Sequence, residues 1–551
     1  MYENMTLYDA FKFTASKSPH AVAVYYQGYK FTYAKLDKQI SSMADAIYHR
    51  LGIRKGDVVV VAQPNIPHVL ILYYALNKIG AVINFIHPFT PYNQVLEIMK
   101  KTNSKMAFLF EQRVAKEVEK YRSIADKIYL TRVEDFLPLG KRFIYHNFLN
   151  NKIRKKLGRW RGQFFGFNYV YQLKPTGKPF PINTQNDKEL SILLHSGSTT
   201  GEPKTICLSD SRLNFIADRF NEILGCKKED IKKFSMLTVL PSFHGFGLCM
   251  TMHGPLVTQM RVVLMPKFSV KETVHLMNKN KISFICGVPT MYENLLKYPD
   301  FINSKKLKNL HSCYCGGDAM PEKLKIDFDN LMIKNNYFAR LYEGYGLTEC
   351  VAVNIVNGVK ASKIGALGKP VNGAEVKIID ENGHSLPINE VGEIVLKSPS
   401  IMIGYYKDEK ATKNALIDGW LHTGDLGYID EEGFVFFKSR KKRVVKVSGV
   451  GVFPTEIEKL VSSIHGVKSC CAIQIPDERL QHAIKIFVVA DYFDEEGMRE
   501  SIMEKCQKYL IRWAVPKEIE FRKELPLTKL NKVDFMALQK EENAKRDINN
   551  A

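Results

Sequence analysis

The chain has 551 residues, with 79 Lys or Arg against 58 Asp or Glu, so its formal charge is +21. This length suffices for several domains with hydrophobic cores of their own. The ordinary shares of apolar residues (45%) and charged residues (25%) exclude a wholly disordered or collagen-like protein. The positive charge predicts attraction to polyanions, and nucleotide phosphates, nucleic acid and an anionic membrane surface all stay open at this point.

We expect neither a secretory signal nor a membrane-spanning helix. The first residues lack a basic region followed by an apolar run. The most apolar stretch, 68–86, is interrupted by Asn77, Lys78, Gly80 and Asn84, so it falls short of the length of a spanning helix. All ten cysteines lie at or after Cys207, and none has the CxxC spacing of a zinc or redox site. These features predict a soluble, cytoplasmic protein with reduced cysteines.

The first two thirds of the chain are expected to alternate between short strands and helices. The β-branched run at 57–62 is followed by a polar turn and a helical pattern over 68–78, which is typical of a βα unit in a parallel sheet. Further strands are expected at 106–110, 127–130, 261–265 and 284–287, and helices at 270–279 and 289–296. Repeated units of this kind predict a doubly wound α/β architecture with mixed sheets.

The pattern changes after Gly365. Short apolar runs at 375–379, 392–396 and 434–437 are punctuated by Gly and Pro, and they predict a small β-barrel-like subdomain over 365–438. After a basic run at 439–443, the tail combines expected helices at 454–463 and 500–510 with strands at 468–475 and 483–489. We therefore expect an α/β protein with a large N-terminal domain over 1–439, a linker at 440–443 and a small, mobile α+β C-terminal domain over 444–551.

A basic segment at 141–178 holds ten Lys or Arg and no acidic residue. Within it Tyr145, Leu149, Ile153 and Leu157 recur every four residues, so a helix there would carry an apolar stripe beside a basic face. The favoured interpretation is a helix that packs this stripe on the core and leaves the basic face in solvent. Peripheral contact with an anionic membrane stays open as the alternative. Interleaved aromatic residues such as Trp160 leave nucleic-acid stacking open as well.

The most informative stretch is Ser196-Gly-Ser-Thr-Thr-Gly-Glu-Pro-Lys204, which follows an apolar strand end. Small residues allow backbone N–H groups to turn toward an anion, hydroxyl groups add donors, and the terminal lysine supplies a positive charge for phosphate oxygens. The spacing differs from that of a Walker A loop, in which two glycines separated by four other residues precede Lys-Ser or Lys-Thr. The composition nevertheless indicates a phosphate cradle.

This loop resembles the phosphate-binding signature of the adenylate-forming (AMP-binding) superfamily, which includes acyl-CoA synthetases, luciferases and nonribosomal-peptide adenylation domains. Companion motifs follow in the family's order. They are Pro241-Ser-Phe-His-Gly-Phe-Gly247, Gly316-Gly317, Tyr345-Gly-Leu-Thr-Glu349, Gly392-Glu393, Gly404-Tyr405, Leu421-His-Thr-Gly-Asp425, Arg440-Lys-Lys442, Val447-Ser-Gly449 and Pro526-Leu-Thr-Lys-Leu-Asn-Lys532. The matches span 196–532, and the segments after Arg440 are most similar to bacterial fatty-acid–CoA ligases.

The resemblance implies a two-step ligase that uses ATP, Mg²⁺, coenzyme A and a small-molecule carboxylic acid. The carboxylate attacks the α-phosphate of ATP to give an acyl-adenylate and pyrophosphate, and a thiol then attacks the carbonyl of the adenylate. Both reactants of the first step are anionic, so it needs charge neutralisation and positioning more than acid–base chemistry. The resemblance assigns catalysis to Lys532, His244 and Thr348, with Lys532 bridging the carboxylate and α-phosphate oxygens.

The nucleotide contacts that the resemblance implies come from several motifs. The phosphates would be held by Ser196, Gly197, Ser198, Thr199, Thr200, Gly201 and Lys204. The adenine and the α-phosphate would be contacted by Gly316, Gly317, Tyr345, Gly346 and Thr348. Asp425 would accept hydrogen bonds from the ribose hydroxyls, with Arg440 in support. Glu349, together with Thr199, would bind Mg²⁺, a hard ion suited to oxygen ligands.

The resemblance assigns the second half-reaction to the C-terminal domain. Lys442 is the expected hinge about which this domain rotates between the two half-reactions. Lys446, Ser448 and Gly449 would line the tunnel for the thiol. The acyl pocket is expected among His244, Phe246, Gly317, Gly344, Gly346 and Val351, and it would take an apolar acid such as a medium- or long-chain fatty acid.

Four positions depart from the family pattern. Ser198 and Asn531 stand where the family has glycine, Arg443 replaces an acidic residue after the hinge, and Gly451 replaces a polar one. The last two belong to the second half-reaction, so the thiol acceptor stays open. An acyl-CoA synthetase is the favoured function, followed by an adenylation enzyme that loads a carrier protein. A non-catalytic polyanion- or membrane-binding protein is disfavoured, and nucleic-acid binding is the least supported.

Overall fold

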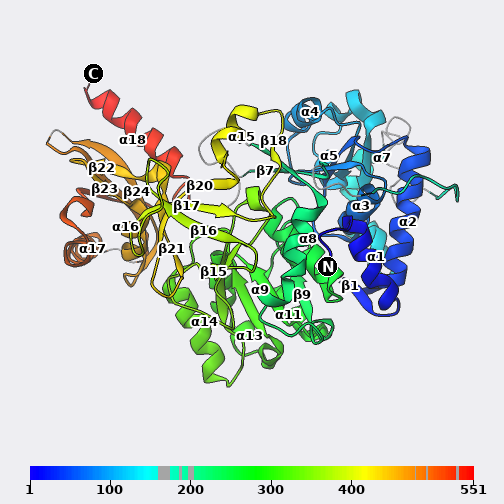
Figure 1. Cartoon of the computed structure of the whole chain (residues 1–551), viewed down its shortest axis with the longest axis horizontal. Coiled ribbons are helices and arrows are strands. Elements are labelled where there is room, and N and C mark those ends of the chain that lie inside the picture. Colours follow the sequence, from blue (N-terminus) through cyan, green and yellow to red (C-terminus); the bar gives the residue numbers. More distant parts are fainter. Residues whose placement is uncertain are drawn as a thin grey trace. The chain divides into compact units, whose positions relative to one another are not determined.

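The computed structural model describes residues 1–158, 174–184, 189–196, 204–477, 479–491, 494–528 and 533–550. The chain divides into two compact units. The first contains Met1–Ser196, Lys204–Glu375 and Lys397–Gly419, and the second contains Gly197–Pro203, Val376–Leu396 and Trp420–Ala551. Each unit combines helices with β-sheet (Figure 1), and the predicted α/β class is confirmed. The predicted domain boundaries around 440–443 stay predictions.

One sheet of the first unit has seven strands in the order β18-β8-β7-β4-β3-β5-β6. Strands β7, β4, β3, β5 and β6 run parallel, whereas β8 and β18 are antiparallel to their neighbours. Every residue of β3 and β4 is buried, as expected of parallel strands covered on both faces. In chain order the strands are β3 (Val58–Ala62), β4 (Val82–Phe85), β5 (Met106–Phe110), β6 (Ile128–Thr131), β7 (Ile192–His195), β8 (Thr205–Leu208) and β18 (Gly404–Tyr405).

A second sheet of the first unit has nine strands in the order β15-β14-β13-β12-β11-β9-β10-β1-β2. Its central strands, from β13 to β1, are parallel, and antiparallel strands lie at both edges. The strands are β1 (Val22–Tyr26), β2 (Tyr29–Thr32), β9 (Ser235–Thr238), β10 (Arg261–Leu264), β11 (Phe284–Gly287), β12 (Ser312–Cys315), β13 (Leu341–Tyr345), β14 (Ile355–Val356) and β15 (Lys369–Pro370). The expected doubly wound arrangement of mixed sheets is confirmed.

Helices connect and cover these sheets. The longer ones are α1 (Leu7–Lys17), α2 (Tyr33–Arg50), α3 (Pro67–Lys78), α4 (Tyr92–Lys101), α7 (Asn151–Gly158), α8 (Asp210–Asp218), α11 (Val270–Lys279), α12 (Pro289–Leu296) and α14 (Glu322–Lys334). Shorter ones are α5 (Glu111–Val114), α6 (Leu139–Ile144), α9 (Phe220–Ile223), α10 (Gly254–Val257), α13 (Pro299–Ile302) and α15 (Glu409–Ala415), and β19 (Leu416–Ile417) follows α15. The described 3₁₀-helices of the first unit are η1 (Lys120–Lys127), η2 (Val133–Phe136), η6 (Ile231–Lys233), η8 (Lys305–Asn309) and η9 (Thr348–Cys350). The described π-helices are η3 (Tyr145–Leu149) and η7 (Phe246–His253).

Helix α3 explains the apolar stretch at 68–86. Its residues from Pro67 to Asn77 are all buried, so the stretch is a core helix followed by strand β4. Pro67 begins the helix, where the missing N–H of proline has no intrahelical partner to lose. Among the helices that the structure describes, none combines the length and the apolar character that crossing a membrane requires.

The basic segment is only partly described, because 159–173, with Trp160, lie outside the described residues. In the described part, Tyr145 is half-buried and its hydroxyl accepts a hydrogen bond from Gln112 Nε2 at 3.0 Å. Ile153 packs against the hydrophobic core around β5 and β6. These two members of the predicted apolar stripe therefore face the core, as the favoured interpretation expected.

The described part of the second unit contains three groups of strands. β16 (Glu375–Ile379), β17 (Gly392–Lys397), β20 (Trp420–Ile429) and β21 (Val435–Arg440) are neighbours in one sheet, and β22 (Val445–Val447) and β23 (Val450–Val452) form a hairpin. β24 (Val467–Asp477) and β25 (Gln481–Ala490) are antiparallel, and β26 (Glu518–Phe521) runs parallel to β25. The helices are η10 (Lys441–Arg443), α16 (Pro454–Ser462), α17 (Glu495–Tyr509), η11 (Arg512–Ala514) and α18 (Phe535–Asn550).

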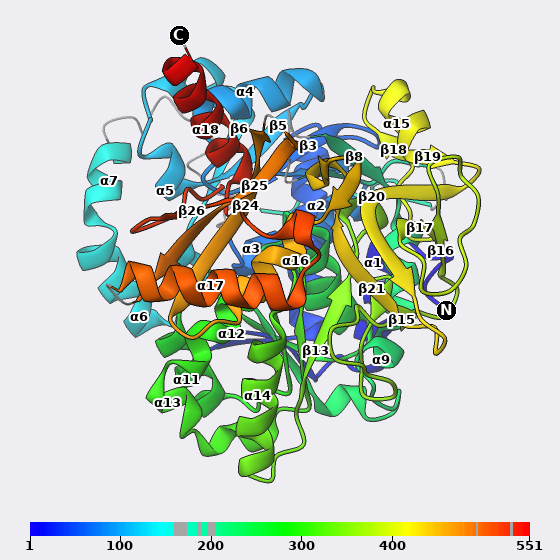
Figure 2. The same cartoon turned by 90° about the vertical axis from the view of Figure 1, so that its left-hand side faces the viewer.

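The sheet of β24, β25 and β26 is covered on both faces (Figure 2). Successive side chains of a strand point to opposite faces. Ile484, Ile486 and Val488 share a core with α16 and α17, whereas Phe487 packs in a second core with Leu538 of α18. Because both faces of the sheet are covered, β25 has a long apolar run. The combination of this sheet with helices is the α+β structure expected of the tail.

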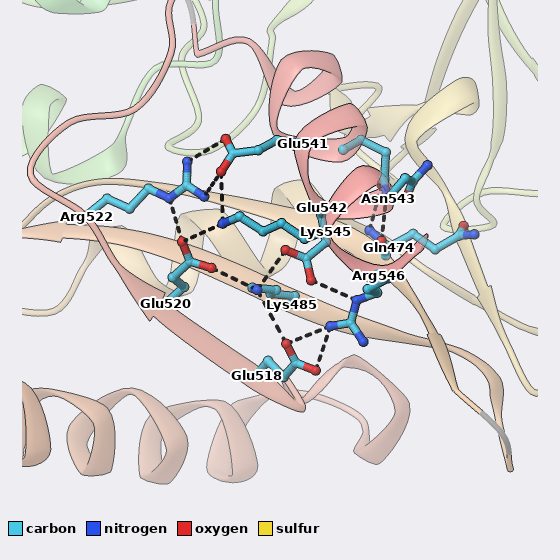
Figure 3. A network of polar contacts seen from close by, with 11 residues as sticks. Gln474, Lys485, Glu518, Glu520, Arg522, Glu541, Glu542, Asn543, Lys545 and Arg546 are labelled. Atoms are coloured by element: carbon cyan, nitrogen blue, oxygen red, sulfur yellow. Dashed lines mark hydrogen bonds and ion pairs between the residues drawn. The ribbon is translucent and has the colours of Figure 1, made fainter. Parts of the chain in front are cut away.

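An ionic network attaches α18 to this sheet (Figure 3). Lys485, which is about nine-tenths buried, contacts Glu542 at 2.8 Å, Glu520 at 2.9 Å and Glu518 at 3.5 Å. The neighbouring pairs are Arg522 with Glu541 and Glu520, Arg546 with Glu518 and Glu542, and Lys545 with Glu541 and Glu520. Four cations thus face four carboxylates, so this group contributes nothing to the positive excess of the chain.

All ten cysteines are free thiols, and eight of them are buried. Burial raises the pKa of every one of them, for example to about 12 for Cys207 and to about 11 for Cys506. The expectation of reduced core cysteines therefore agrees with the structure.

A buried carboxylate joins four parts of the first unit. Asp210 at the start of α8 accepts hydrogen bonds from Asn77 Nδ2 (2.8 and 2.9 Å), from the backbone N–H of Leu7 (3.3 Å) and from the Ser191 hydroxyl. Burial raises its pKa to about 6 in spite of these donors. The side chain therefore stabilises the contacts of α1, α3 and α8 with the residue before β7.

We predict that Asp210→Ala lowers the free energy of unfolding of the first unit by about 3 kcal/mol, because it leaves several buried donors without an acceptor. Chemical denaturation followed by tryptophan fluorescence and circular dichroism would measure the change. Glu229→Ala is the control, since Glu229 is exposed. Equal stability of the two variants would contradict the prediction.

Candidate functional site

The ends of the predicted phosphate loop are held together where β7 meets β8. The backbone N–H of Ser196 donates to the carbonyl oxygen of Lys204 at 2.9 Å, and the N–H of Lys204 donates to the Ser196 hydroxyl at 3.0 Å. The residues between them, 197–203, lie outside the described residues, and with them the predicted ligands Gly197, Ser198, Thr199, Thr200 and Gly201. The described contacts therefore determine where this loop begins and ends.

Lys204, Tyr405 and Glu349 meet in the first unit. The pairing of β18 with β8 places Tyr405 opposite Ile206, beside the end of the loop. The Nζ atom of Lys204 lies 4.3 Å from the centroid of the Tyr405 ring, and the Tyr405 hydroxyl donates to Glu349 Oε1 at 3.0 Å. Burial and the nearby Glu349 carboxylate raise the pKa of Tyr405, so this hydroxyl keeps its proton at neutral pH. One tyrosine thus contacts both a cation and a carboxylate.

Glu349 has the chemistry of a magnesium ligand. Among the side chains that the structure describes, no group of three or more His, Cys, Asp or Glu is arranged to hold a metal ion. Mg²⁺ that is bound largely through substrate phosphates needs only one or two protein carboxylates. Glu349 at the edge of the loop fits this requirement, while Thr199, the other predicted ligand, lies outside the described residues.

The segment that carries Thr348 and Glu349 turns sharply after β13. At Gly346 a Cβ atom would lie 1.5 Å from the carbonyl oxygen of Ala352, so only glycine fits there. Val351 has a φ of 67°, a conformation that costs a β-branched residue on the order of 1–3 kcal/mol and that often occurs at functional sites. Thr348 and Glu349 therefore lie in a tight, sterically determined turn, next to Tyr345 at the end of β13.

The predicted acyl-pocket residues Phe246 and Gly344 come together around Gly316. A Cβ atom on Gly316 would lie 2.9 Å from the carbonyl oxygen of Gly344 and 3.2 Å from the Phe246 ring. Gly317, the next residue, has a φ of 78°, which favours glycine. The Gly-Gly pair thus permits the close approach of three chain segments that the adenine and acyl assignments require.

His244 lies in an aromatic group. Its ring is 4.7 Å from the ring of Phe243, which in turn lies 4.9 Å from the ring of His87. Gly245 directly follows His244, and a Cβ atom on it would lie 1.5 Å from the carbonyl oxygen of the predicted pocket residue Val351. The turn after β13 and the segment around His244 are therefore in direct contact.

The predicted ribose ligand Asp425 lies in the second unit. It is 1% exposed, and its Oδ1 atom pairs with Arg440 Nε at 2.8 Å across strands β20 and β21, where the two residues are direct partners. The backbone N–H of Asp425 donates to the Thr423 hydroxyl at 3.0 Å. The structure therefore brings together two of the residues assigned to ribose and phosphate.

Glu393 is a further residue of this region to which the sequence assigned no role. Its carboxylate accepts a hydrogen bond from the backbone N–H of Gly424 at 3.0 Å, and it pairs with Lys441 at 3.0 Å and with His422 at 3.7 Å. It thus supports the turn before Asp425 from the neighbouring strand. The Gly392-Glu393 motif was visible in the sequence, but its contacts were not. The Gly404-Tyr405 motif was likewise visible in the sequence, but the contacts of Tyr405 were not.

The predicted hinge residue Lys442 lies in the short helix η10, which follows β21. The unusual Arg443 beside it has an explanation within the second unit. Its guanidinium group forms two hydrogen bonds with Glu458 of α16 (2.6 and 3.2 Å) and a third with the carbonyl oxygen of Ala472 (3.2 Å). Arg443 therefore attaches the chain after the hinge to α16 and β24.

The predicted tunnel residues form a tight hairpin. Lys446 is exposed in β22, and Ser448 and Gly449 make the turn to β23 with φ values of 49° and 80°. Two consecutive residues with positive φ are typical of a two-residue hairpin turn. The positive φ therefore explains why glycine occupies position 449. Its role in a thiol tunnel stays a prediction. Lys532 lies outside the described residues.

Comparison with known proteins identifies the family of the chain. A family model described as AMP-binding enzyme matches residues 11–406, and a model of the AMP-binding enzyme C-terminal domain matches 456–532. The long-chain-fatty-acid–CoA ligase of Bacillus subtilis (strain 168) is 29% identical over 554 residues, which cover 99% of this chain and 96% of that protein.

Two solved structures share the fold. One is the anthranilate CoA ligase AuaEII in complex with anthranoyl-AMP, with a TM-score of 0.81, 20% identity and coverage of 98% of this chain and 97% of that one. The other is the o-succinylbenzoate coenzyme A synthetase of Bacillus subtilis in complex with ATP and magnesium ion, with a TM-score of 0.78, 21% identity and coverage of 95% and 98%. Since the first family model alone spans more than half of the residues, the resemblance seen in the sequence is confirmed, and this chain belongs to the family of AMP-binding enzymes.

Proposed function

We propose that this chain is an AMP-forming acyl-CoA ligase that activates a medium- or long-chain fatty acid with ATP and transfers it to coenzyme A. The observation that carries the proposal is the meeting of Lys204 and Glu349 on Tyr405, beside the closed base of the phosphate loop. A cation for phosphate oxygens and a carboxylate for a metal ion are what adenylation of an anionic substrate requires. The near full-length similarity to a long-chain-fatty-acid–CoA ligase supports the class of acid.

In the first half-reaction the protein mainly positions and neutralises charge. Lys204 would bind phosphate oxygens of ATP, Thr348 would contact the α-phosphate, and Glu349 would hold Mg²⁺, which supplies positive charge to the phosphates. Tyr405 orients the Glu349 carboxylate through its hydroxyl and takes the Lys204 ammonium group on its ring face. Lys532 would stabilise the charge that develops as the carboxylate attacks and pyrophosphate leaves.

In the second half-reaction the thiol of coenzyme A attacks the acyl carbonyl and AMP leaves. We assign this step to the hairpin with Lys446, Ser448 and Gly449, brought to the adenylate by rotation about Lys442. The Arg443–Glu458 pair supports this assignment, because it would move the hairpin, α16 and the sheet as one body. The free cysteines support a reducing compartment such as the cytoplasm.

Pyrophosphate release with acids of increasing chain length, with and without coenzyme A, tests the function. We expect release to be fastest with medium- or long-chain acids, and an acyl-CoA to form when coenzyme A is present. No release with any acid would contradict an enzymatic function and favour a binding protein with this fold. Release without thioester formation would instead point to a carrier protein as the acceptor.

We predict that Lys532→Ala slows adenylation by about a hundredfold or more, because it removes a cation that acts in the transition state. Thioester formation from supplied acyl-adenylate should persist, and measuring the two half-reactions separately checks both expectations. Lys523→Ala, at an exposed lysine of the same connection, is the control and should leave both rates unchanged. Loss of both half-reactions in the Lys532 variant would contradict the assignment of Lys532 to adenylation alone.

Tyr405→Phe removes only the hydroxyl that contacts Glu349. We predict that it raises the Mg²⁺ concentration for half-maximal pyrophosphate release by roughly tenfold, as is typical when the partner of a metal ligand is lost. Tyr406→Phe is a matched control, because that hydroxyl instead donates to the carbonyl oxygen of Thr102 at 3.5 Å. The same Mg²⁺ dependence in both variants would show that Tyr405 does not position the carboxylate.

A further inference from the structure

Helix α6 exposes three large apolar side chains. Leu139 is 87% exposed, Phe143 is 66% exposed and Ile144 is 55% exposed. Leu139 and Phe143 are four residues apart and so lie on the same side of the helix. These three residues, called the apolar ridge below, are distinct from the stripe that the sequence predicted, of which Tyr145 and Ile153 face the core. Such a concentration of exposed apolar surface in one short helix needs an explanation.

The charges in the sequence around the apolar ridge are all positive. Residues 137–158 contain six Lys or Arg and no Asp or Glu. Lys141, Lys152 and Lys155 are exposed. The acidic residues that contact this region, Glu111 and Glu134, are 3% and 1% exposed, so they leave the surface cationic. A ligand for this surface must therefore be both apolar and anionic.

Hydrogen bonds hold the segment on the core while the apolar ridge stays outside. Lys141 Nζ donates to the carbonyl oxygen of Gln27 at 3.1 Å. Asn150 Nδ2 donates to Glu111 Oε1 at 2.9 Å, and His146 contacts Glu134 Oε1 at 3.1 Å. Along the chain Lys141 lies within the apolar ridge, and His146 and Asn150 follow it. The ridge is thus presented outward by a segment that is attached on its other side.

We propose that the apolar ridge docks this protein on an anionic lipid membrane. Leu139, Phe143 and Ile144 would enter the boundary between headgroups and acyl chains, and the surrounding lysines would pair with anionic headgroups. An apolar face bordered by cations is the pattern of helices that lie in a membrane interface, and a cluster of lysine and arginine is attracted to anionic lipid. The docking goes beyond the proposed ligase activity and does not depend on it, because α6 contains none of the assigned nucleotide or acyl contacts.

Cosedimentation of the full chain with lipid vesicles tests the proposal. The probes are vesicles of phosphatidylcholine mixed with phosphatidylglycerol and vesicles of phosphatidylcholine alone, each at low and high salt. We expect binding to the mixed vesicles at low salt, weaker binding at high salt, and little binding to phosphatidylcholine alone. The triple variant L139S/F143S/I144S should bind the mixed vesicles about tenfold more weakly, and K152Q/K155Q, at two exposed lysines, should reduce the binding and its salt dependence.

The matched control is I333S/F338S, which removes two apolar side chains that are 53% and 63% exposed on and after α14. It should bind vesicles like the unaltered chain. Thermal unfolding should be the same for all variants, since every altered residue is at least partly exposed. Equal vesicle binding by the triple variant and the unaltered chain would overturn the proposal. The proposal would also be overturned if the unaltered chain bound no vesicles and formed a dimer that only the triple variant dissociates. That result would assign the apolar ridge to self-association.

Discussion

The candidate site depends on the way in which strand β8 is paired. On one side β8 pairs with β7, and the hydrogen bonds between Ser196 and Lys204 close the base of the phosphate loop. On the other side it pairs with β18, which brings Tyr405 beside Lys204 and within hydrogen-bonding distance of Glu349. A shift of one residue in the register of β18 would turn Tyr405 to the opposite face of the sheet. Backbone pairing at one edge of a sheet therefore decides which side chains can cooperate on a nucleotide.

The positive excess of the chain is distributed unevenly, and this distribution separates structural from functional charge. The network around Lys485 balances every cation with a carboxylate, and Arg443 has its partner in Glu458. Lys204 lies instead on an aromatic ring, and the lysines around the apolar ridge face solvent without acidic neighbours in the surrounding sequence. Balanced groups stabilise the fold, whereas the unbalanced ones remain available to anions. Within the described residues, the distribution of the +21 charge is thus best understood from which cations pair with carboxylates and which do not.

Motifs and periodicity predicted much of the fold and of the site. The strands and helices of the first unit and the α+β tail were expected from their apolar runs, and the pairing of Asp425 with Arg440 agrees with the motifs that contain them. The roles of Tyr405 and Glu393 were missed, because each depends on the register between strands far apart in the sequence. The partner of Arg443, a residue that departs from the family pattern, was also missed, because Glu458 lies on a helix 15 residues further along the chain.

The basic segment shows another limit of sequence reasoning. A four-residue spacing was assumed to run through an unbroken α-helix, but 145–149 form a π-helical turn between α6 and α7. Such a turn contains more residues than an α-helical one and changes which side chains share a face. The stripe therefore describes the turn and the part after it, where Tyr145 is half-buried and Ile153 reaches the core, and it gave no indication of the exposed residues before the turn.

The burial of the cysteines has a chemical consequence for an enzyme of this family. An acyl-adenylate is a mixed anhydride, and the thiolate form of cysteine is the nucleophile that it would acylate most readily. Because every thiol has a raised pKa and most are shielded from solvent, the protein carries almost no thiolate at neutral pH. Burial of the thiols thus lowers the competition that the enzyme's own cysteines offer to the thiol of a substrate.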